Sequence, residues 1–212
     1  MRGLKRCVVL SAWVLWSVAV PVAANAQERD GFWFGIGGGG GSAAITCDDC
    51  NEGRESSGVA SIRLGWTLSK RLLIGGEVNV WDKTFVVVDE GVKATATDGL
   101  YNFAGTLTFY PKVTSGFFVK GGAGMSAADI QLDVAGTNVT VNLGTGPGLI
   151  AGAGYDFRVG RKISVTPAVN AWYGQLGDVK LAGERFLKLA GEPFLNNWKH
   201  NVIDFTLGIT FH

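Results

Sequence analysis

The stretch NVIDFTLGITFH, residues 201–212, places an apolar side chain at every second position. The alternating apolar residues are Ile203, Phe205, Leu207, Ile209 and Phe211. Because successive side chains of a strand point to opposite sides, this period of two predicts a β-strand with one apolar and one polar face. Aromatic residues on the apolar face are typical of strands that cross a membrane as part of a barrel. The edge strand of a soluble sandwich is the alternative.

The other end of the chain predicts export. Residues 1–27 read MRGLKRCVVLSAWVLWSVAVPVAANAQ, with a basic start, a short apolar run and small residues after it. This order is typical of a secretory signal peptide, residues 1–26, cleaved after the small residues Ala24 and Ala26. A membrane anchor is the alternative, although the apolar run is short for one. Cys7 precedes the run and leaves with the signal.

Seven further segments of the chain alternate in the same way. Each is about ten residues long, which suits a membrane-crossing strand, and no apolar run after residue 26 is long enough for a membrane helix. With the final segment they predict eight strands over residues 27–212, at 31–42, 59–68, 72–81, 100–110, 116–126, 148–157, 163–173 and 201–212.

The connections between these segments alternate in length. Three are tight, with the sequences SKR, PKVTS and VGRK, whereas the four others are long. Short turns on one side and long loops on the other are typical of an outer-membrane barrel, in which the long loops face outward. The sequence therefore predicts an all-β fold, an eight-stranded antiparallel up-and-down transmembrane β-barrel. A soluble lipocalin-like barrel is the alternative, but it has no reason for this alternation.

Several strand-and-turn patterns resemble one family. GGEVNVW (75–81), GFFVKGGAG (116–124), GAGYDFRVGRKISVTPAVNAWYG (152–174) and the closing NVIDFTLGITFH resemble the small outer-membrane β-barrel domain family, in the style of OmpA-like and opacity-like barrels. The resemblance implies the outer membrane of a diderm bacterium, contact with its lipids, and insertion by the barrel-assembly machinery. The chain departs from the family by ending in His212 rather than an aromatic residue, so Phe211 is expected to serve in the insertion signal.

Charged residues fall on the polar faces of the predicted strands. An eight-stranded barrel is just wide enough for side chains to fill it, so these residues are expected to form an ion-pair network that plugs the lumen. The tight turn at LSKRL sets a register that places Arg63 opposite Glu77. A path for ions or protons through the same residues is the alternative, which would make the protein a narrow channel. The predicted network comprises Arg63, Glu77, Lys120, Asp156 and Asp204.

Two motifs that suggest other chemistry are rejected. A G-x-G-x-x-G match at Gly35, Gly37 and Gly40 lacks the helix that a dinucleotide site needs directly after it. A lipid-modifying enzyme of the outer leaflet would need a Ser beside a His, but no Ser neighbours His200 on the same face of its strand. We therefore predict no catalytic residue, no metal site and no cofactor. Cleavage of the signal would remove three of the 19 basic residues, so the 18 acidic residues would slightly outnumber the basic residues that remain. This balance disfavours nucleic acid as a partner.

The first long loop contains TCDDC, with Cys47 and Cys50 in a C-x-x-C frame. Asp48 and Asp49 would oppose a reactive thiolate, and no second pair of ligands is present for zinc. At the cell surface the two cysteines are expected to form a disulfide bond, and metal binding is the alternative if they are free.

The two last long loops bear on function. Residues 128–144, ADIQLDVAGTNVTVNLG, predict a projecting hairpin. The last loop carries an apolar group that could contact a host or surface ligand or form the aromatic girdle of the membrane interface. This group comprises Phe186, Leu189, Phe194, Leu195 and Trp198. The sequence therefore predicts a structural or surface-interaction role.

Overall fold

A computed structural model of the chain describes residues 29–46, 53–89, 92–134, 137–177, 180–181, 184–185 and 198–212. The expected signal peptide, with Ala24 and Ala26, lies outside the described residues, as do Cys47 and Cys50. The apolar group of the last loop also lies outside them, apart from Trp198.

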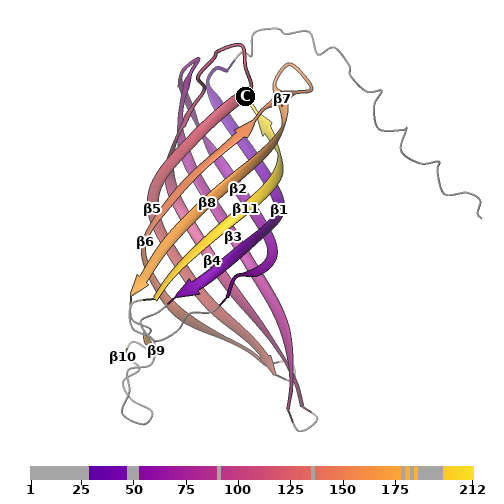
Figure 1. Cartoon of the computed structure of the whole chain (residues 1–212), viewed down its shortest axis with the longest axis vertical. Helices are drawn as coiled ribbons and strands as arrows, with labels where there is room; N and C mark the ends of the chain where they lie inside the picture. Colours follow the sequence, from indigo (N-terminus) through magenta and orange to yellow (C-terminus); the bar gives the residue numbers. More distant parts are fainter. Residues whose placement is uncertain are drawn as a thin grey trace, which may run out of the picture.

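The predicted eight-stranded barrel is confirmed. Antiparallel strands follow one another in chain order. The last long strand pairs both with the first strand and with the long strand before it in the chain, which closes the sheet (Figure 1). The long strands are β1 (Phe32–Thr46), β2 (Glu55–Ser69), β3 (Leu72–Asp89), β4 (Val92–Phe109), β5 (Phe117–Val134), β6 (Thr137–Tyr155), β8 (Ile163–Gly177) and β11 (Trp198–Phe211). Three two-residue strands are β7 (Phe157–Arg158), β9 (Lys180–Leu181) and β10 (Glu184–Arg185). Within the described ranges, no helix is long and apolar enough to span a membrane.

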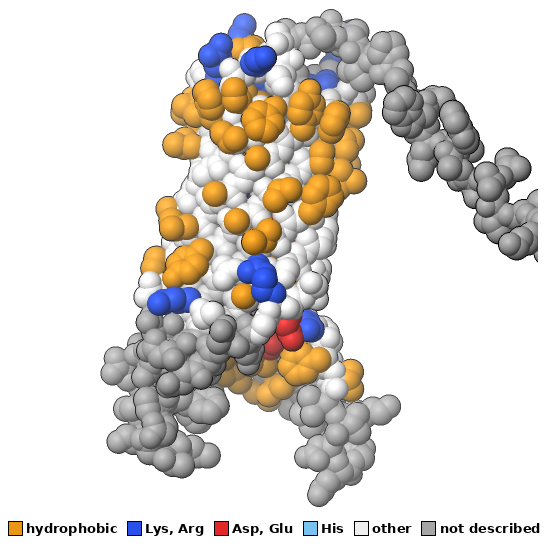
Figure 2. Space-filling view, viewed as in Figure 1, with side chains coloured by type: hydrophobic (Ala, Val, Ile, Leu, Met, Phe, Trp, Pro, Cys, Tyr) orange, Lys and Arg blue, Asp and Glu red, His pale blue; other side chains and the backbone are white. Residues whose placement is uncertain are grey.

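The barrel carries its apolar side chains on the outside. On β11, Phe205 and Leu207 are each 56% exposed, whereas the intervening Thr206 is 4% exposed. The same alternation on the other long strands produces an apolar outer surface, seen near the turn end of the barrel in Figure 2. Such a surface is stable in lipid and not in water, so the predicted division into lipid-facing and inward faces is confirmed.

Four strands extend well beyond the segments of about ten residues that cross the membrane. The ladder between β3 and β4 continues to Asp89↔Val92, so the loop expected at residues 82–99 is wrong. The three successive valines at 86–88 favour a strand. The outward-facing Asp82 ends the apolar band of the outer surface but does not end the strand. The β5–β6 hairpin continues to Val134↔Thr137, as predicted. About ten residues cross a membrane, so these strands of 18 and 19 residues project beyond it on the side away from the tight turns.

Two clusters of buried apolar side chains occupy opposite ends of the lumen. The outer cluster is built around Trp81, Leu100, Trp172, Trp198 and Val202. The turn-end cluster contains Trp33, Leu73, Tyr110, Phe118 and Ala168. Polar side chains lie between the two clusters, so the candidate site is enclosed by the barrel wall and by these two groups.

Candidate functional site

An ion pair lies in the middle of the lumen. Lys120 on β5 places its Nζ 2.5 and 2.6 Å from the two carboxylate oxygens of Glu77 on β3, and both side chains are almost fully buried. The predicted register is confirmed, because Arg63 is the cross-strand partner of Glu77. The ion pair nevertheless joins Glu77 to Lys120. In this charge-assisted pair each charge compensates the other, because a single unpaired charge would be strongly unfavourable in the interior.

Arg63 points toward the turn end instead. Its guanidinium donates to Thr210 Oγ1 at 2.7 Å, and Thr210 shares a hydrogen bond of 2.8 Å with Thr166. Thr166 in turn donates to Asp156 Oδ1 at 2.7 Å. Two hydroxyl groups therefore connect Arg63 to Asp156 across β11 and β8.

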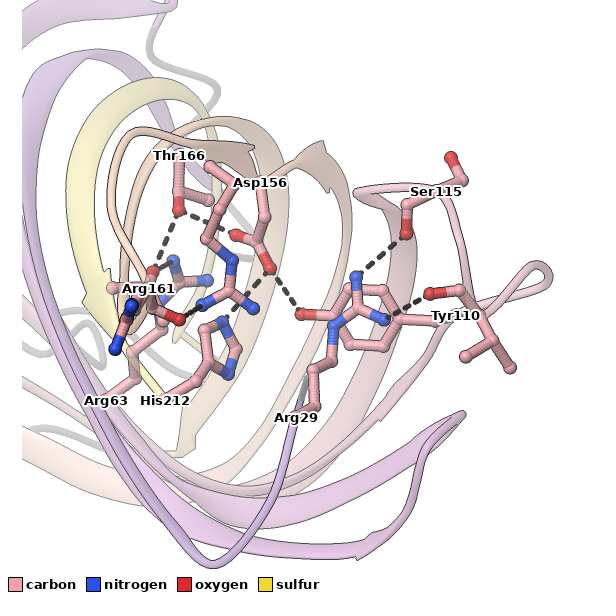
Figure 3. A network of polar contacts seen from close by, with 11 residues as sticks. Arg29, Arg63, Tyr110, Ser115, Asp156, Arg161, Thr166 and His212 are labelled. Atoms are coloured by element: carbon pink, nitrogen blue, oxygen red, sulfur yellow. Dashed lines mark hydrogen bonds and ion pairs between the residues drawn. The ribbon is translucent and has the colours of Figure 1, made fainter. Parts of the chain in front are cut away.

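Asp156 is the centre of a buried polar cluster at the turn end (Figure 3). Tyr110 donates to its Oδ2 at 2.7 Å, and Nε2 of His212 lies 3.4 Å from the same oxygen. Burial alone would raise the pKa of this carboxyl, but His212 and the hydroxyl donors Tyr110 and Thr166 stabilise the carboxylate and lower the pKa to about 2. The site thus holds a carboxylate in its charged form.

Arg29 closes the same end of the barrel from the segment before β1. Its guanidinium stacks on the Tyr110 ring at 3.5 Å and donates to the backbone oxygens of Ser115 at 2.8 Å and Val113 at 3.4 Å (Figure 3). Desolvation by burial lowers the pKa of Arg29, while Tyr110 and Asp156 act in the opposite direction. The sequence did not predict this contact, because nothing in the local pattern shows that the segment folds back over the turn.

Asp204, the fifth predicted residue, belongs to a separate group. It accepts hydrogen bonds from Asn170 Nδ2 at 2.7 Å and from Trp172 Nε1 at 2.9 Å. These bonds compensate its burial without a direct cation. The five predicted residues therefore all lie inside the barrel, but their contacts, direct or through the two hydroxyl groups, divide them into three groups.

A small group of buried polar residues, which the sequence did not predict, lies near the outer cluster. Asn102 donates to Ser126 Oγ at 3.1 Å, and a Cβ added to Gly174 would meet both Ser126 and the His200 ring. His200 packs edge-on against Trp172 and is 0% exposed, as is Ser126. No Ser neighbours His200 on the same face of β11, but closure of the barrel brings Ser126 of β5 close to it. The His200 and Ser126 side chains are both closed to solvent.

A small cavity lies in the polar middle, with room for about one water molecule. Arg63, Glu77 and Lys120 are among its lining residues. Among the described residues, no group of three or more His, Cys, Asp or Glu is arranged to hold a metal ion. The polar side chains of the lumen therefore bind one another.

Comparison with known proteins identifies the fold. No protein-family model and no curated protein matches the chain. Among solved structures it is similar to Ail, the attachment invasion locus protein of Yersinia pestis, at 10% identity and a TM-score of 0.56, over 85% of this chain and 99% of that one. It is also similar to Neisserial surface protein A, at 12% identity and a TM-score of 0.51, over 87% of this chain and 99% of that one.

The fold is that of a small outer-membrane β-barrel. The resemblance expected from the sequence is confirmed at this level, and the apolar outer band places the barrel in the bacterial outer membrane. In barrels of this kind the tight turns face the periplasm and the long hairpins face outward.

Proposed function

We propose that this outer-membrane β-barrel has a structural and surface-interaction role, in which a closed barrel presents its outward hairpins to a ligand outside the cell. The observation that carries the proposal is the length of β3, β4, β5 and β6, whose 18 or 19 residues exceed what the membrane requires. Strands that stay paired beyond the lipid form a rigid wall, and a rigid wall presents side chains at low entropic cost. Outer-membrane lipids and the barrel-assembly machinery are the other proposed partners.

The chemistry of the projecting wall favours a protein ligand. Exposed apolar side chains, namely Phe85, Val86 and Val139, are 40%, 61% and 50% exposed. Exposed apolar groups on an otherwise polar surface are typical of protein contact sites.

Charge on the same wall disfavours a polyanion. The charged residues with described side chains there are Asp82, Lys83, Asp98, Asp129 and Asp133, so acids predominate. Ail was solved in complex with the heparin analogue sucrose octasulfate, which is a polyanion. The acidic wall of this chain supports a different ligand.

A shortened hairpin tests the proposal. Thr84 and Thr97 are cross-strand partners joined by a hydroxyl contact of 2.9 Å, so an Asn-Gly turn can replace residues 85–96 between them. Cells that display the parent barrel should bind immobilised host-surface proteins, and cells with the shortened hairpin should lose that binding. Equal binding by both, with equal folded barrel in the membrane, would contradict the proposal.

A narrow channel is the second candidate, favoured by the charged lining of the central cavity. The closed-lumen proposal is better supported, because Lys120 and Glu77 meet across the middle and apolar clusters occupy both ends. In planar-bilayer recordings the refolded parent should show no steady conductance. Steady conductance that disappears in Glu77→Ala would establish the channel instead.

An enzymatic role finds less support. His200 and Ser126 are both fully buried, so a lipid substrate has no access to them in this conformation. We propose that the His200 ring has a packing role, and loss of a lipid-hydrolysing activity in His200→Ala would overturn this.

A further inference from the structure

A groove interrupts the lipid-facing surface where β8, β11 and β1 meet. Ile36 lies opposite Ile209, which lies opposite Val165, and these three form a continuous apolar row across the strands. In the next row, Gly38 lies opposite Leu207 and contributes no side chain. The groove is lined by Ile36, Gly37, Gly38, Val165, Leu207, Gly208 and Ile209. It lies on the outer wall, so its occupant comes from the membrane.

A basic turn lies at the periplasmic end of the same wall. Arg161 and Lys162 immediately precede β8, and both side chains are exposed. Their backbone carbonyls accept hydrogen bonds from Arg158 Nη1 at 3.1 Å and from the His212 amide at 2.9 Å. The turn is therefore held in place by its main chain, while its two cationic side chains are exposed and free of these bonds.

The whole periplasmic rim is basic. Its exposed cations are Lys70, Arg71, Lys112, Arg161 and Lys162, seen in part as the blue groups above the apolar band in Figure 2. Among the described residues of this rim, Asp30 is the exposed acid. Each basic residue near a charged lipid surface contributes about 1 kcal/mol of attraction, so the rim complements anionic headgroups.

We propose that the groove and the turn together bind one anionic glycerophospholipid of the periplasmic leaflet. Arg161 and Lys162 take the phosphate, and an acyl chain passes Ile163 and enters the groove beside Gly38. Val165 is three residues beyond Lys162, or about 10 Å along the strand, which lies within the roughly 15 Å half-thickness of a bilayer core. The headgroup and the chain therefore reach their sites in the direction that a lipid of this leaflet takes.

The neighbouring basic turn lacks the second half of this site. Lys70 and Arg71 lie beside Leu68 and Trp66, which are 58% and 56% exposed and fill the lipid-facing surface there. That turn attracts anionic headgroups but provides no recess for a chain. It is thus a matched control, with the same charge and no groove. The proposal is independent of any ligand of the outward hairpins.

Native mass spectrometry of the folded, detergent-solubilised full chain tests the site. Phosphatidylglycerol should give a retained one-lipid adduct, and phosphatidylcholine with the same acyl chains should bind roughly tenfold more weakly because it has no net charge. R161Q/K162Q should weaken the phosphatidylglycerol adduct by a similar factor, whereas K70Q/R71Q should change it less than about twofold. Equal losses in the two charge variants would show unspecific attraction and overturn the proposal.

Filling the groove tests the acyl half. A Cβ added at Gly38 would come no closer than 3.7 Å to a neighbouring atom, and one at the lipid-facing Gly105 no closer than 3.8 Å, so both positions accept a side chain. Gly38→Leu should weaken the adduct, and Gly105→Leu should not. If Gly38→Leu binds normally and excess inorganic phosphate displaces the lipid, the turn is a plain anion site and the groove assignment is wrong. If Gly38→Leu does not fold, the charge variants decide, because they leave the β1–β11 pairing unchanged.

Discussion

Lys120 and Glu77 form a buried ion pair across the lumen, although the sheet register places Arg63 directly beside Glu77. The pair spans from β3 to β5, which are not hydrogen-bonded neighbours. It therefore links two strands on either side of β4 through the interior of the barrel.

Removing one partner of this pair should destabilise the barrel strongly. Glu77→Ala leaves the Lys120 ammonium buried without compensation, with an expected cost of about 3–5 kcal/mol. Urea unfolding, followed by the heat-sensitive gel mobility of the folded form, measures it. The double variant Glu77→Ala/Lys120→Ala is the control and should recover part of the loss. A single variant as stable as the parent would contradict the buried pair.

Asp156 should make stability depend on pH. Its pKa of about 2 in the folded state lies below its ordinary value of 3.8, so the stabilisation is complete above pH 3.8 and is lost as the pH falls toward 2. The difference corresponds to about 2 kcal/mol. Unfolding midpoints measured from pH 6 down to about pH 2 should fall in the parent. Asp156→Asn should be less stable at neutral pH and lose this part of the slope; an unchanged slope would refute the assignment.

Arg29 should fasten the segment before β1 to the turn after β4. Arg29→Ala removes the stacking on Tyr110 and two hydrogen bonds to backbone oxygens, which should cost about 1–3 kcal/mol. Limited proteolysis from the periplasmic side should then release the N-terminal segment. The exposed neighbour Asp30 provides the control, since Asp30→Ala should leave both stability and cleavage unchanged.

Gly39 and Gly40 should differ sharply in tolerance to a methyl group. A Cβ at Gly39 would overlap the backbone oxygen of Phe205, whereas one at Gly40 would come no closer than 3.9 Å to Ser57 O. Gly39→Ala should therefore reduce the yield of folded barrel severalfold, and Gly40→Ala should refold like the parent. Similar yields from the two variants would mean that the β1–β11 register is wrong.

Cys47 and Cys50 lie outside the described residues, so their disulfide stays a prediction. Intact-mass spectrometry of the non-reduced protein should find no free thiol in the mature chain. Two free thiols would reopen metal binding at this loop. The effect on barrel stability should be small, because a loop this short removes little entropy from the unfolded chain.

The strands were predictable because each alternates between lipid and lumen, and their pairing followed from the tight turns. The same reasoning placed Arg63 opposite Glu77 correctly. It did not place Lys120 beside Glu77, because contacts across the lumen depend on strand tilt and shear, which no local pattern encodes. The outer halves of β3 and β4 were missed because Asp82 and Lys83 end the apolar alternation, although the backbone ladder continues past them.

The cluster around Asp156 also brings together the two extremities of the described chain. Arg29 packs on Tyr110, Tyr110 donates to Asp156, and His212 contacts the same carboxylate. A short linker from His212 to Arg29 could therefore be combined with new ends opened at the β3–β4 hairpin, between Asp89 and Val92. The barrel is, in this sense, a natural candidate for circular permutation, with a free terminus moved to the cell surface for display.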